Sequence, residues 1–266
     1  MPNRIDTIFA DTDGSRSPVL GLFVTVGFPD VTTSTEIAEA VLEAGADFLE
    51  LGVPFSDPLA EGPTIQKTSH RALQQGVNVA VCLDVVRSLR KRGTTSPLIF
   101  MGYYNPYLRY GLEEFVGDAA EAGLDGLIVP DLPHEEATTL RELCDSRGIY
   151  LIPLLAPTST DERIAVACEH ARGFIYCVSV TGVTGAREQL RSGVEELVSR
   201  IRRHTALPIL VGFGVKTREH VESIGAFATG AVIGSALLDA VDQAQNGRTV
   251  DAAQRFVARV RPPPRR

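Results

Sequence analysis

The chain has 266 residues, of which 44% are hydrophobic and 22% charged, a balance typical of a globular protein with a substantial buried core. Lysine and arginine total 26 against 33 aspartate and glutamate, and the net charge of −7 argues against nucleic acid as a partner. Because no apolar run reaches the roughly 18 residues of a membrane span and the first residues lack a signal-peptide core, we expect a cytoplasmic protein with no membrane partner.

Eight short apolar runs follow one another along the chain and predict eight β-strands. They occupy residues 19–25, 48–51, 98–101, 127–129, 150–155, 174–178, 209–211 and 231–233. Between them, apolar residues recur every three or four positions, as Ile37, Val41 and Ala44 do, which predicts amphipathic helices.

Local signals mark the ends of these helices. Thr33 and Glu36 have the spacing of a capping box at a helix start. Glycines stand where helices should end, at Gly45, Gly123, Gly148 and Gly173. The repeating unit is therefore strand, loop, helix and turn.

Strands without polar alternation, separated by helices, indicate a parallel sheet that is buried on both faces. Eight such units predict an α/β fold of the (β/α)8 TIM-barrel type, a single domain over residues 1–266 with a flexible Pro/Arg-rich tail from about residue 261. A doubly wound open sheet is the alternative. The missing G-x-G-x-x-G after the first run favours the barrel.

In a parallel barrel the loops that follow the strands share one face, where function is concentrated. Glu50 falls inside the second apolar run and Glu61 in the loop that follows it, so two carboxylates converge on this face. Burial between Leu49 and Leu51 would raise the pKa of Glu50 towards values suited to proton transfer. The alternative for Glu50 is a salt-bridged structural carboxylate, and for Glu61 a solvated loop residue.

Asp131 follows the fourth run within Pro-Asp-Leu-Pro, where capping of loop amides and direct chemistry are equally open. Tyr176, in the sixth run, is either a core residue or a hydroxyl directed into the mouth of the barrel.

Glycine clusters follow the last three runs, at residues 181–185, 211–215 and 232–236. Glycine lets backbone N–H groups approach an anion, and loops after strands seven and eight recur as phosphate sites in barrels. A small phosphorylated substrate is therefore expected.

The sequence predicts no metal, because the five histidines lack ligand spacing and no His/Cys/Asp set is present. The four cysteines form no C-x-x-C pair and are expected to be reduced core residues.

Six blocks resemble the tryptophan synthase alpha subunit family in order and spacing, from about Ile5 to Val260: LELGVPFSDPLAEGPTIQ, MGYYNP, IVPDLP, SVTGVTGA, GFGV and IGSA. The resemblance implies a lyase of tryptophan biosynthesis that cleaves indole-3-glycerol phosphate to indole and glyceraldehyde 3-phosphate by a retro-aldol reaction. It implies no cofactor in this chain. Pyridoxal phosphate is expected only in a partner beta subunit, within an α2β2 heterotetramer.

The resemblance also implies roles for single residues. Glu50 is the acid-base group, Glu61 receives the indole N–H, and Tyr176 positions the glutamate and the substrate. The resemblance implies further substrate-binding residues in three groups. The indole pocket is formed by Phe23, Met101, Ile128 and Leu154, with Tyr103 at its edge, and the phosphate is bound by Gly185, Phe213, Gly214, Gly234 and Ser235. Asp131 and Thr184 complete the set.

One position departs from the family, which normally carries aspartate where this chain has Glu61. The extra methylene moves the carboxylate outward, and catalytic alignment is sensitive to about 1 Å. We therefore expect reduced or altered turnover. The alternatives kept open are a stand-alone lyase that releases indole, a catalytically weakened regulatory subunit, and a distant sugar-phosphate isomerase of the same fold.

Overall fold

The computed structural model describes residues 3–10, 17–178, 187–212, 214–245 and 247–263. Within them the strands are β1 (Val19–Thr25), β2 (Phe48–Gly52), β3 (Leu98–Met101), β4 (Gly126–Ile128), β5 (Tyr150–Leu151), β6 (Leu154–Leu155), β7 (Ile175–Val178), β8 (Ile209–Gly212) and β9 (Gly230–Ile233).

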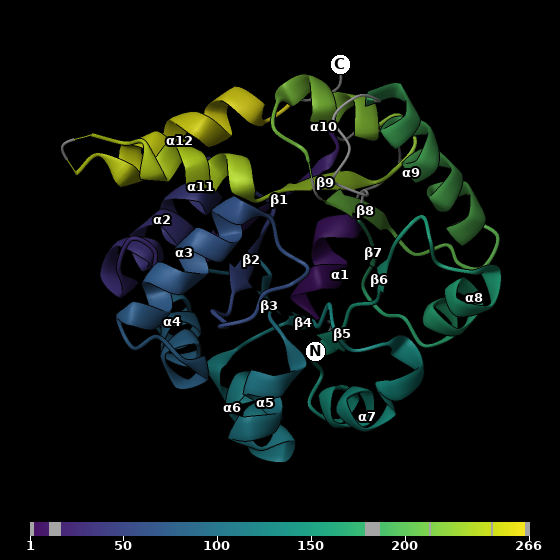
Figure 1. Cartoon of the computed structure of the whole chain (residues 1–266), viewed down its shortest axis with the longest axis horizontal. Helices are drawn as coiled ribbons and strands as arrows, with labels where there is room; N and C mark the ends of the chain where they lie inside the picture. The colour runs from purple at the N-terminus through teal and green to yellow at the C-terminus, as the bar shows by residue number, and fades with distance from the viewer. Residues whose placement is uncertain (1–2, 11–16, 179–186, 213, 246, 264–266) are drawn as a thin grey trace.

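The helices surround the strands (Figure 1). They are α1 (Arg4–Phe9), α2 (Val31–Glu43), α3 (Pro63–Gln74), α4 (Val79–Lys91), α5 (Tyr104–Tyr110), α6 (Leu112–Ala122), the 3₁₀ turn η1 (His134–Glu136), α7 (Thr138–Ser146), α8 (Asp161–Glu169), α9 (Arg187–Ile201), α10 (Arg218–Ile224), α11 (Ser235–Asp242) and α12 (Thr249–Val260). No helix in the described ranges is long and apolar enough to cross a membrane.

The strands form one parallel sheet in the order β5-β4-β3-β2-β1-β9-β8-β7-β6. The two ends of this order, β5 and β6, are joined by only Ile152 and Pro153, so the sheet curls round and closes through the chain itself. The predicted α/β barrel is confirmed, and the open doubly wound sheet is not observed.

The fifth apolar run, predicted as one strand over residues 150–155, instead forms two. The Ile152 N–H donates to Leu127 O on the β4 side at 2.9 Å, whereas the Pro153 carbonyl accepts from Tyr176 N on the β7 side at 3.0 Å. Because proline has no N–H, Pro153 can offer only its carbonyl to the β7 side, and the run is divided at this residue.

The helix starting at Val31 is capped one turn earlier than the sequence suggested. Asp30 accepts a hydrogen bond from Thr33 N at 2.8 Å, which makes Asp30 the N-cap and Thr33 an interior residue. The predicted capping box of Thr33 and Glu36 is therefore wrong, since an aspartate three residues upstream provides the same bond. The four glycines predicted to end helices all have positive φ, between 73° and 111°.

Aromatic side chains close the end of the barrel opposite the strand-end loops. Phe174 packs between Phe48 and Phe9, with ring centroids 5.8 and 6.0 Å away. Gly21 makes room for the Phe48 ring, because a β-carbon at Gly21 would overlap it. With this end filled by α1 and its neighbours, the opposite face is left for a ligand.

The C-terminal segment is tied to the barrel at Arg261, where the flexible tail was predicted to begin. Arg261 Nη2 donates to Asp47 Oδ1 at 3.2 Å, and the other Asp47 oxygen accepts from Leu20 N at 2.7 Å. Residues 264–266 lie outside the described residues.

Candidate active site

A cavity of about 570 Å³ opens at the carboxyl ends of the strands, and we call it the barrel-mouth cavity. Its lining comes from β1, β2, β3, β7 and β9, from the loop between β2 and α3, and from the starts of α3 and α11. The lining residues are Phe23, Glu50, residues 59–65, Met101, Tyr176, residues 214–216, Val232, Gly234, Ser235 and Asp239.

Glu50 reaches this cavity from inside the barrel wall. On β2 it pairs with Phe23 of β1 and Ile99 of β3, and its neighbours Leu49 and Leu51 are directed to the opposite face of the strand. The side chain is 1% exposed, and neither carboxylate oxygen has a hydrogen-bond partner within the described structure. Burial raises the pKa of Glu50 to about 8, with a further contribution from Glu61.

Glu61 reaches the same cavity from the loop that follows β2. The loop is held by Tyr103, whose hydroxyl oxygen accepts from Ala60 N at 2.8 Å, and by Gln66, whose amide donates to Glu61 O at 2.9 Å. Glu61 Oε2 is buried and, in the described ranges, makes no hydrogen bond. Burial raises the pKa of Glu61 to about 7.

The two carboxylates are therefore poised for proton transfer. Buried polar groups are normally hydrogen-bonded, and oxygens left without partners at a cavity wall are positioned for a ligand. Raised pKa values keep a carboxyl group protonated near neutral pH, so that it can give a proton as well as accept one.

Tyr176 lies on β7 beside these carboxylates and is 3% exposed. Its pKa is raised well above the usual value, first by burial and then by the charges of Glu50 and Glu61. The ring passes over Gly212 on β8, where a β-carbon would overlap the hydroxyl oxygen. Tyr176 is thereby held as a neutral hydroxyl in the wall of the barrel-mouth cavity.

The far side of the cavity presents backbone groups suited to an anion. Gly214 has φ +75°, a conformation that favours glycine, and Gly234 is the N-cap of α11, which begins at Ser235. The first N–H groups of a helix have no partner within it, and the helix dipole makes this end positive. Thr184, Gly185 and Phe213, also predicted for substrate binding, lie outside the described residues.

Among the lining residues that were not predicted from the sequence, three are polar: Lys216, Thr64 and Asp239. Lys216 follows β8 two residues after Gly214, and its position after a predicted strand was a usable signal. Thr64 and Asp239 lie within helices, where no strand-end rule points to them.

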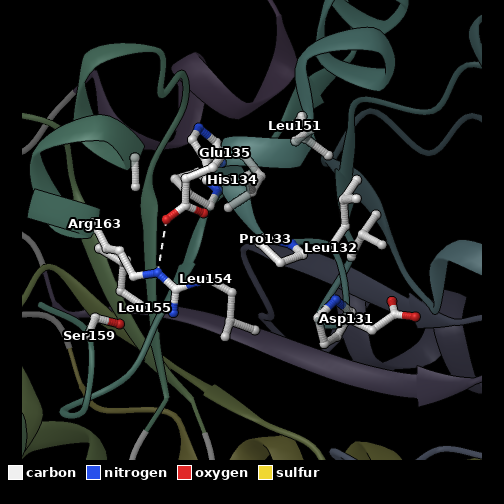
Figure 2. Close-up of a pocket in the computed structure, with 16 residues that line it drawn as sticks. Asp131, Leu132, Pro133, His134, Glu135, Leu151, Leu154, Leu155, Ser159 and Arg163 are labelled. Carbon is white, nitrogen blue, oxygen red and sulfur yellow. Dashed lines mark hydrogen bonds and ion pairs between the residues drawn. The ribbon is translucent and has the colours of Figure 1, made fainter.

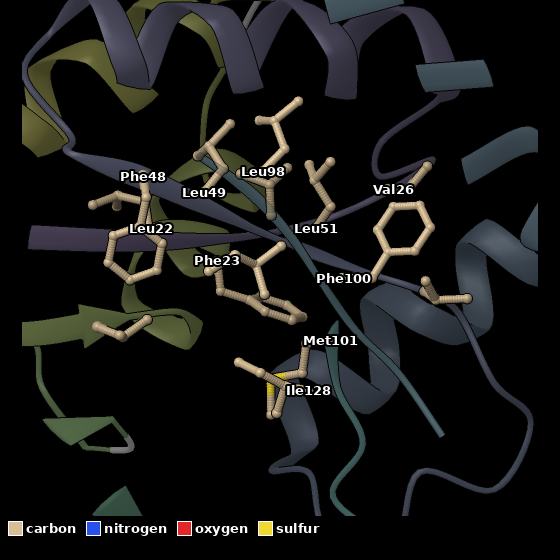
Figure 3. Close-up of a cluster of buried hydrophobic side chains, with 14 of the residues drawn as sticks. Leu22, Phe23, Val26, Phe48, Leu49, Leu51, Leu98, Phe100, Met101 and Ile128 are labelled. Carbon is tan, nitrogen blue, oxygen red and sulfur yellow. The ribbon is translucent and has the colours of Figure 1, made fainter. Parts of the chain in front are cut away.

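The predicted indole pocket is only partly gathered in this cavity. Phe23 and Met101 line it, and Ile128 on β4 pairs with Met101 on β3 in the same apolar cluster (Figure 3). Tyr103 lines a narrow adjoining pocket that shares Phe23, Met101 and Glu61 with the barrel-mouth cavity, and its ring stacks on Phe55 at 5.1 Å.

Asp131 and Leu154 line a separate pocket of about 230 Å³, which we call the outer pocket (Figure 2). Asp131 accepts a hydrogen bond from Tyr104 N at 2.9 Å, the amide-capping arrangement considered from the sequence. Leu154 nevertheless pairs with Tyr176 across β6 and β7, so it is next to the site in the barrel wall. Their contact with a substrate stays a prediction.

The arrangement combines two carboxylates suited to acid-base chemistry, an apolar wall and a helix end suited to an anion in one cavity. Among the described residues no group of three or more His, Cys, Asp or Glu side chains could hold a metal ion. All four cysteines are buried and free.

Comparison with known proteins gives one consistent family. The sequence profile of the family described as tryptophan synthase alpha chain matches residues 9–261. The tryptophan synthase alpha chain of Roseiflexus sp. (strain RS-1) is 48% identical, over 97% of this chain and 99% of the relative. A Saccharomyces cerevisiae protein named tryptophan synthase is 43% identical over 97% of this chain but only 36% of its own length. The crystal structure of tryptophan synthase subunit alpha from Legionella pneumophila str. Paris superposes with a TM-score of 0.89 at 34% identity, covering 98% of this chain and 97% of that one.

Proposed function

The chain belongs to the tryptophan synthase alpha chain family, and from that premise we propose that it cleaves indole-3-glycerol phosphate to indole and glyceraldehyde 3-phosphate in tryptophan biosynthesis. The observation that carries the proposal is the pair Glu50 and Glu61, two carboxylates with raised pKa values whose unpartnered oxygens meet one cavity.

Glu50 carries the main proton transfers in this proposal. Its protonated carboxyl gives a proton to indole C3, which leaves positive charge on the ring nitrogen. The resulting carboxylate then takes the proton of the hydroxyl on the neighbouring carbon. As that C–O becomes a carbonyl, the C–C bond to indole C3 breaks and its electron pair restores the aromatic ring. Glu50 ends protonated as it began, so no proton is gained or lost overall.

Glu61 and Tyr176 assist this exchange. Ionised Glu61 accepts the indole N–H and offsets the positive charge that C3 protonation creates. The two roles require different protonation states: Glu50 must begin protonated to give its proton, and Glu61 must be ionised to accept the indole N–H. The neutral hydroxyl of Tyr176 orients the Glu50 carboxyl and the substrate hydroxyl.

The cavity also suits the two ends of the substrate. Its volume of about 570 Å³ lies within the usual range for small-molecule sites. Phe23 and Met101 offer an apolar wall for the indole ring, while Gly214, Gly234 and Ser235 offer backbone groups for the phosphate.

The retro-aldol step needs no oxidant and no group carrier, which supports our expectation that this chain uses no cofactor. We further propose that it pairs with a pyridoxal-phosphate beta subunit in an α2β2 complex in the cytoplasm. In support, the yeast relative named tryptophan synthase is a much longer chain, of which this sequence matches 36%.

The test is to supply the purified chain with indole-3-glycerol phosphate and to follow indole release, with and without an added beta subunit. Release that requires or strongly increases with the partner is expected, and the Glu50→Gln variant should slow it by about two to four orders of magnitude. Rapid release that the partner does not change would support the stand-alone lyase. No release under either condition would contradict the proposal and support the regulatory subunit. The relatives, named alpha chains, favour neither alternative.

A further inference from the structure

Helices α3 and α11 lie side by side along one edge of the barrel-mouth cavity (Figure 1). At the cavity end of this pair, Thr64 Oγ1 donates a hydrogen bond to Asp239 Oδ1 at 2.9 Å. Both residues line the cavity and both are half-buried. Of the hydrogen bonds described between the two helices, this is the one that joins two cavity-lining residues.

Each helix begins at one functional part of the site. Thr64 is the second residue of α3 and follows Glu61 by three residues, and the Gln66 amide holds the Glu61 carbonyl at 2.9 Å. Asp239 lies four residues after Ser235, hence one turn along the same face of α11. The hydrogen bond therefore connects the segment that carries Glu61 to the helix that begins at the proposed phosphate grip.

We propose that Asp239 is a positioning residue for the cleavage reaction, fixing the Glu61 loop relative to the phosphate-binding end of α11 through Thr64. The proposal rests on the proposed function. Because the substrate phosphate is held at α11 and the indole nitrogen meets Glu61, the length of the substrate must match the distance between these two groups. The Thr64–Asp239 bond sets that distance.

The charge of Asp239 argues for positioning rather than substrate binding. A carboxylate in the wall of a phosphate-binding cavity repels the ligand, and would be unfavourable there without another role. Engaged by the Thr64 hydroxyl, it accepts a hydrogen bond near the N-terminus of α3, where negative charge is stabilised.

A second connection between the same helices provides a matched control. Asp242, one turn further along α11, pairs with Lys67 Nζ at 2.6 Å and Arg71 Nη1 at 3.0 Å. Lys67 and Arg71 are exposed and the Asp242 side chain is partly exposed, and none of the three lines the cavity. Ion pairs near the surface contribute little to folding stability, so we expect their loss to leave the cavity end of the two helices in place.

The experiment compares Asp239→Ala and Thr64→Val, which break the bond from either side, with Asp239→Asn, which keeps an acceptor oxygen. We expect kcat to fall about 10- to 100-fold in the first two, as for roughly 1 Å of misplacement, with KM changed less than about threefold. The double variant Asp239→Ala/Thr64→Val should lose no more kcat than either single variant. Asp239→Asn and Asp242→Ala should stay within about threefold of wild type.

A pH profile separates positioning from general loss of structure. Burial raises the pKa of Glu61 to about 7, and the titratable groups around it are Glu50, Tyr176, Tyr103, Lys216 and Asp239 itself. If the Asp239→Ala loop is looser, Glu61 is better hydrated and its pKa falls towards the ordinary value. Asp239→Ala also removes a negative charge from the cavity, which by itself lowers the pKa of Glu61. The decisive variant is therefore Thr64→Val, which keeps that charge: the acid limb of kcat should move to lower pH in Thr64→Val and not in Asp242→Ala.

Each remaining outcome decides against the proposal. Wild-type kcat in Asp239→Ala would overturn it, and so would an equal loss in Asp242→Ala or no rescue by Asp239→Asn. If the wild-type chain releases no indole, the proposed function fails on its own. The positioning role is then tested by measuring the pKa of Glu61 with carbon NMR on chain labelled at glutamate. An identical pKa in wild type and Thr64→Val would overturn the role as well.

Discussion

The ring of Tyr176 occupies the space above Gly212 on the neighbouring strand, because a β-carbon at Gly212 would overlap the tyrosine hydroxyl oxygen. A side chain at position 212 would therefore push Tyr176 out of the wall of the barrel-mouth cavity. Here the backbone of β8 determines where a proposed functional hydroxyl can lie.

Gly212→Ala should lower indole release at least about tenfold and destabilise the fold by about 1–3 kcal/mol, the usual effect of overpacking. Steady-state kinetics and urea unfolding measure both effects. Gly117→Ala is the control, because a β-carbon there meets no atom within 4 Å. It lies inside α6, so it should leave the rate unchanged and stabilise the chain by about 0.5–1 kcal/mol. Unchanged kinetics in Gly212→Ala would refute the role of Tyr176.

Much of the barrel could be predicted because its strands are buried on both faces and so appear as plain apolar runs. The bounds of the first and third strands match the prediction, and most others differ by one residue. The prediction of the α2 cap was wrong because two nearby residues compete for the cap position. Asp30 and Thr33 both suit a cap, and the sequence does not say which one the chain selects.

The candidate site was predictable where function follows strand order. Glu50 lies within β2 and Ser235 follows β9, and the barrel brings them to one cavity. Asp239 could not be found this way, because its place depends on how α11 packs beside α3. Leu154 shows the reverse difficulty, since a strand-end position alone does not say which of two pockets a side chain will line.

Glu50→Gln should reduce the rate of cleavage by about two to four orders of magnitude, the usual scale for a missing general acid-base group. The amide keeps the size of the side chain but can neither give nor take the proton at indole C3. Single-turnover indole release measures the loss, with circular dichroism to show that the variant is folded. A nearly normal rate would remove Glu50 from the mechanism.

The same variant should become more stable than wild type as pH rises. The pKa of Glu50 is raised from 4.5 to about 8 in the folded chain, so the folded state holds this proton more tightly than the unfolded state. Its contribution to stability is complete below pH 4.5 and is lost as pH rises to about 8. The advantage of Glu50→Gln should grow across this window to an amount on the order of 5 kcal/mol. Chemical denaturation at several pH values measures the free energy of unfolding of both chains. A difference between them that does not change with pH would show that the Glu50 carboxyl is not desolvated.

Glu61→Asp should raise turnover several-fold, because it restores the shorter side chain of the family while keeping the charge. The comparison is kcat for the two chains at the same pH, with Glu61→Gln as the variant that removes the charge. An unchanged rate, or a sharp decrease, would mean that the loop already places the longer side chain correctly.

Lys216→Ala should raise KM about three- to tenfold and leave kcat nearly unchanged, because an exposed charge beside the phosphate contributes about 1 kcal/mol or less. Lys216 lines the barrel-mouth cavity together with Gly214 and Ser235, so its charge acts on the phosphate end and not on the bond that breaks. Salt screens such an interaction, and the difference in KM between wild type and Lys216→Ala should shrink from low to high ionic strength.

Lys67→Ala is the control, because it removes an exposed lysine that pairs with Asp242 outside the cavity and should leave KM unchanged. A KM that rises equally in both variants would show only the effect of net charge, and a fall in kcat would place Lys216 closer to the reacting atoms than this geometry allows.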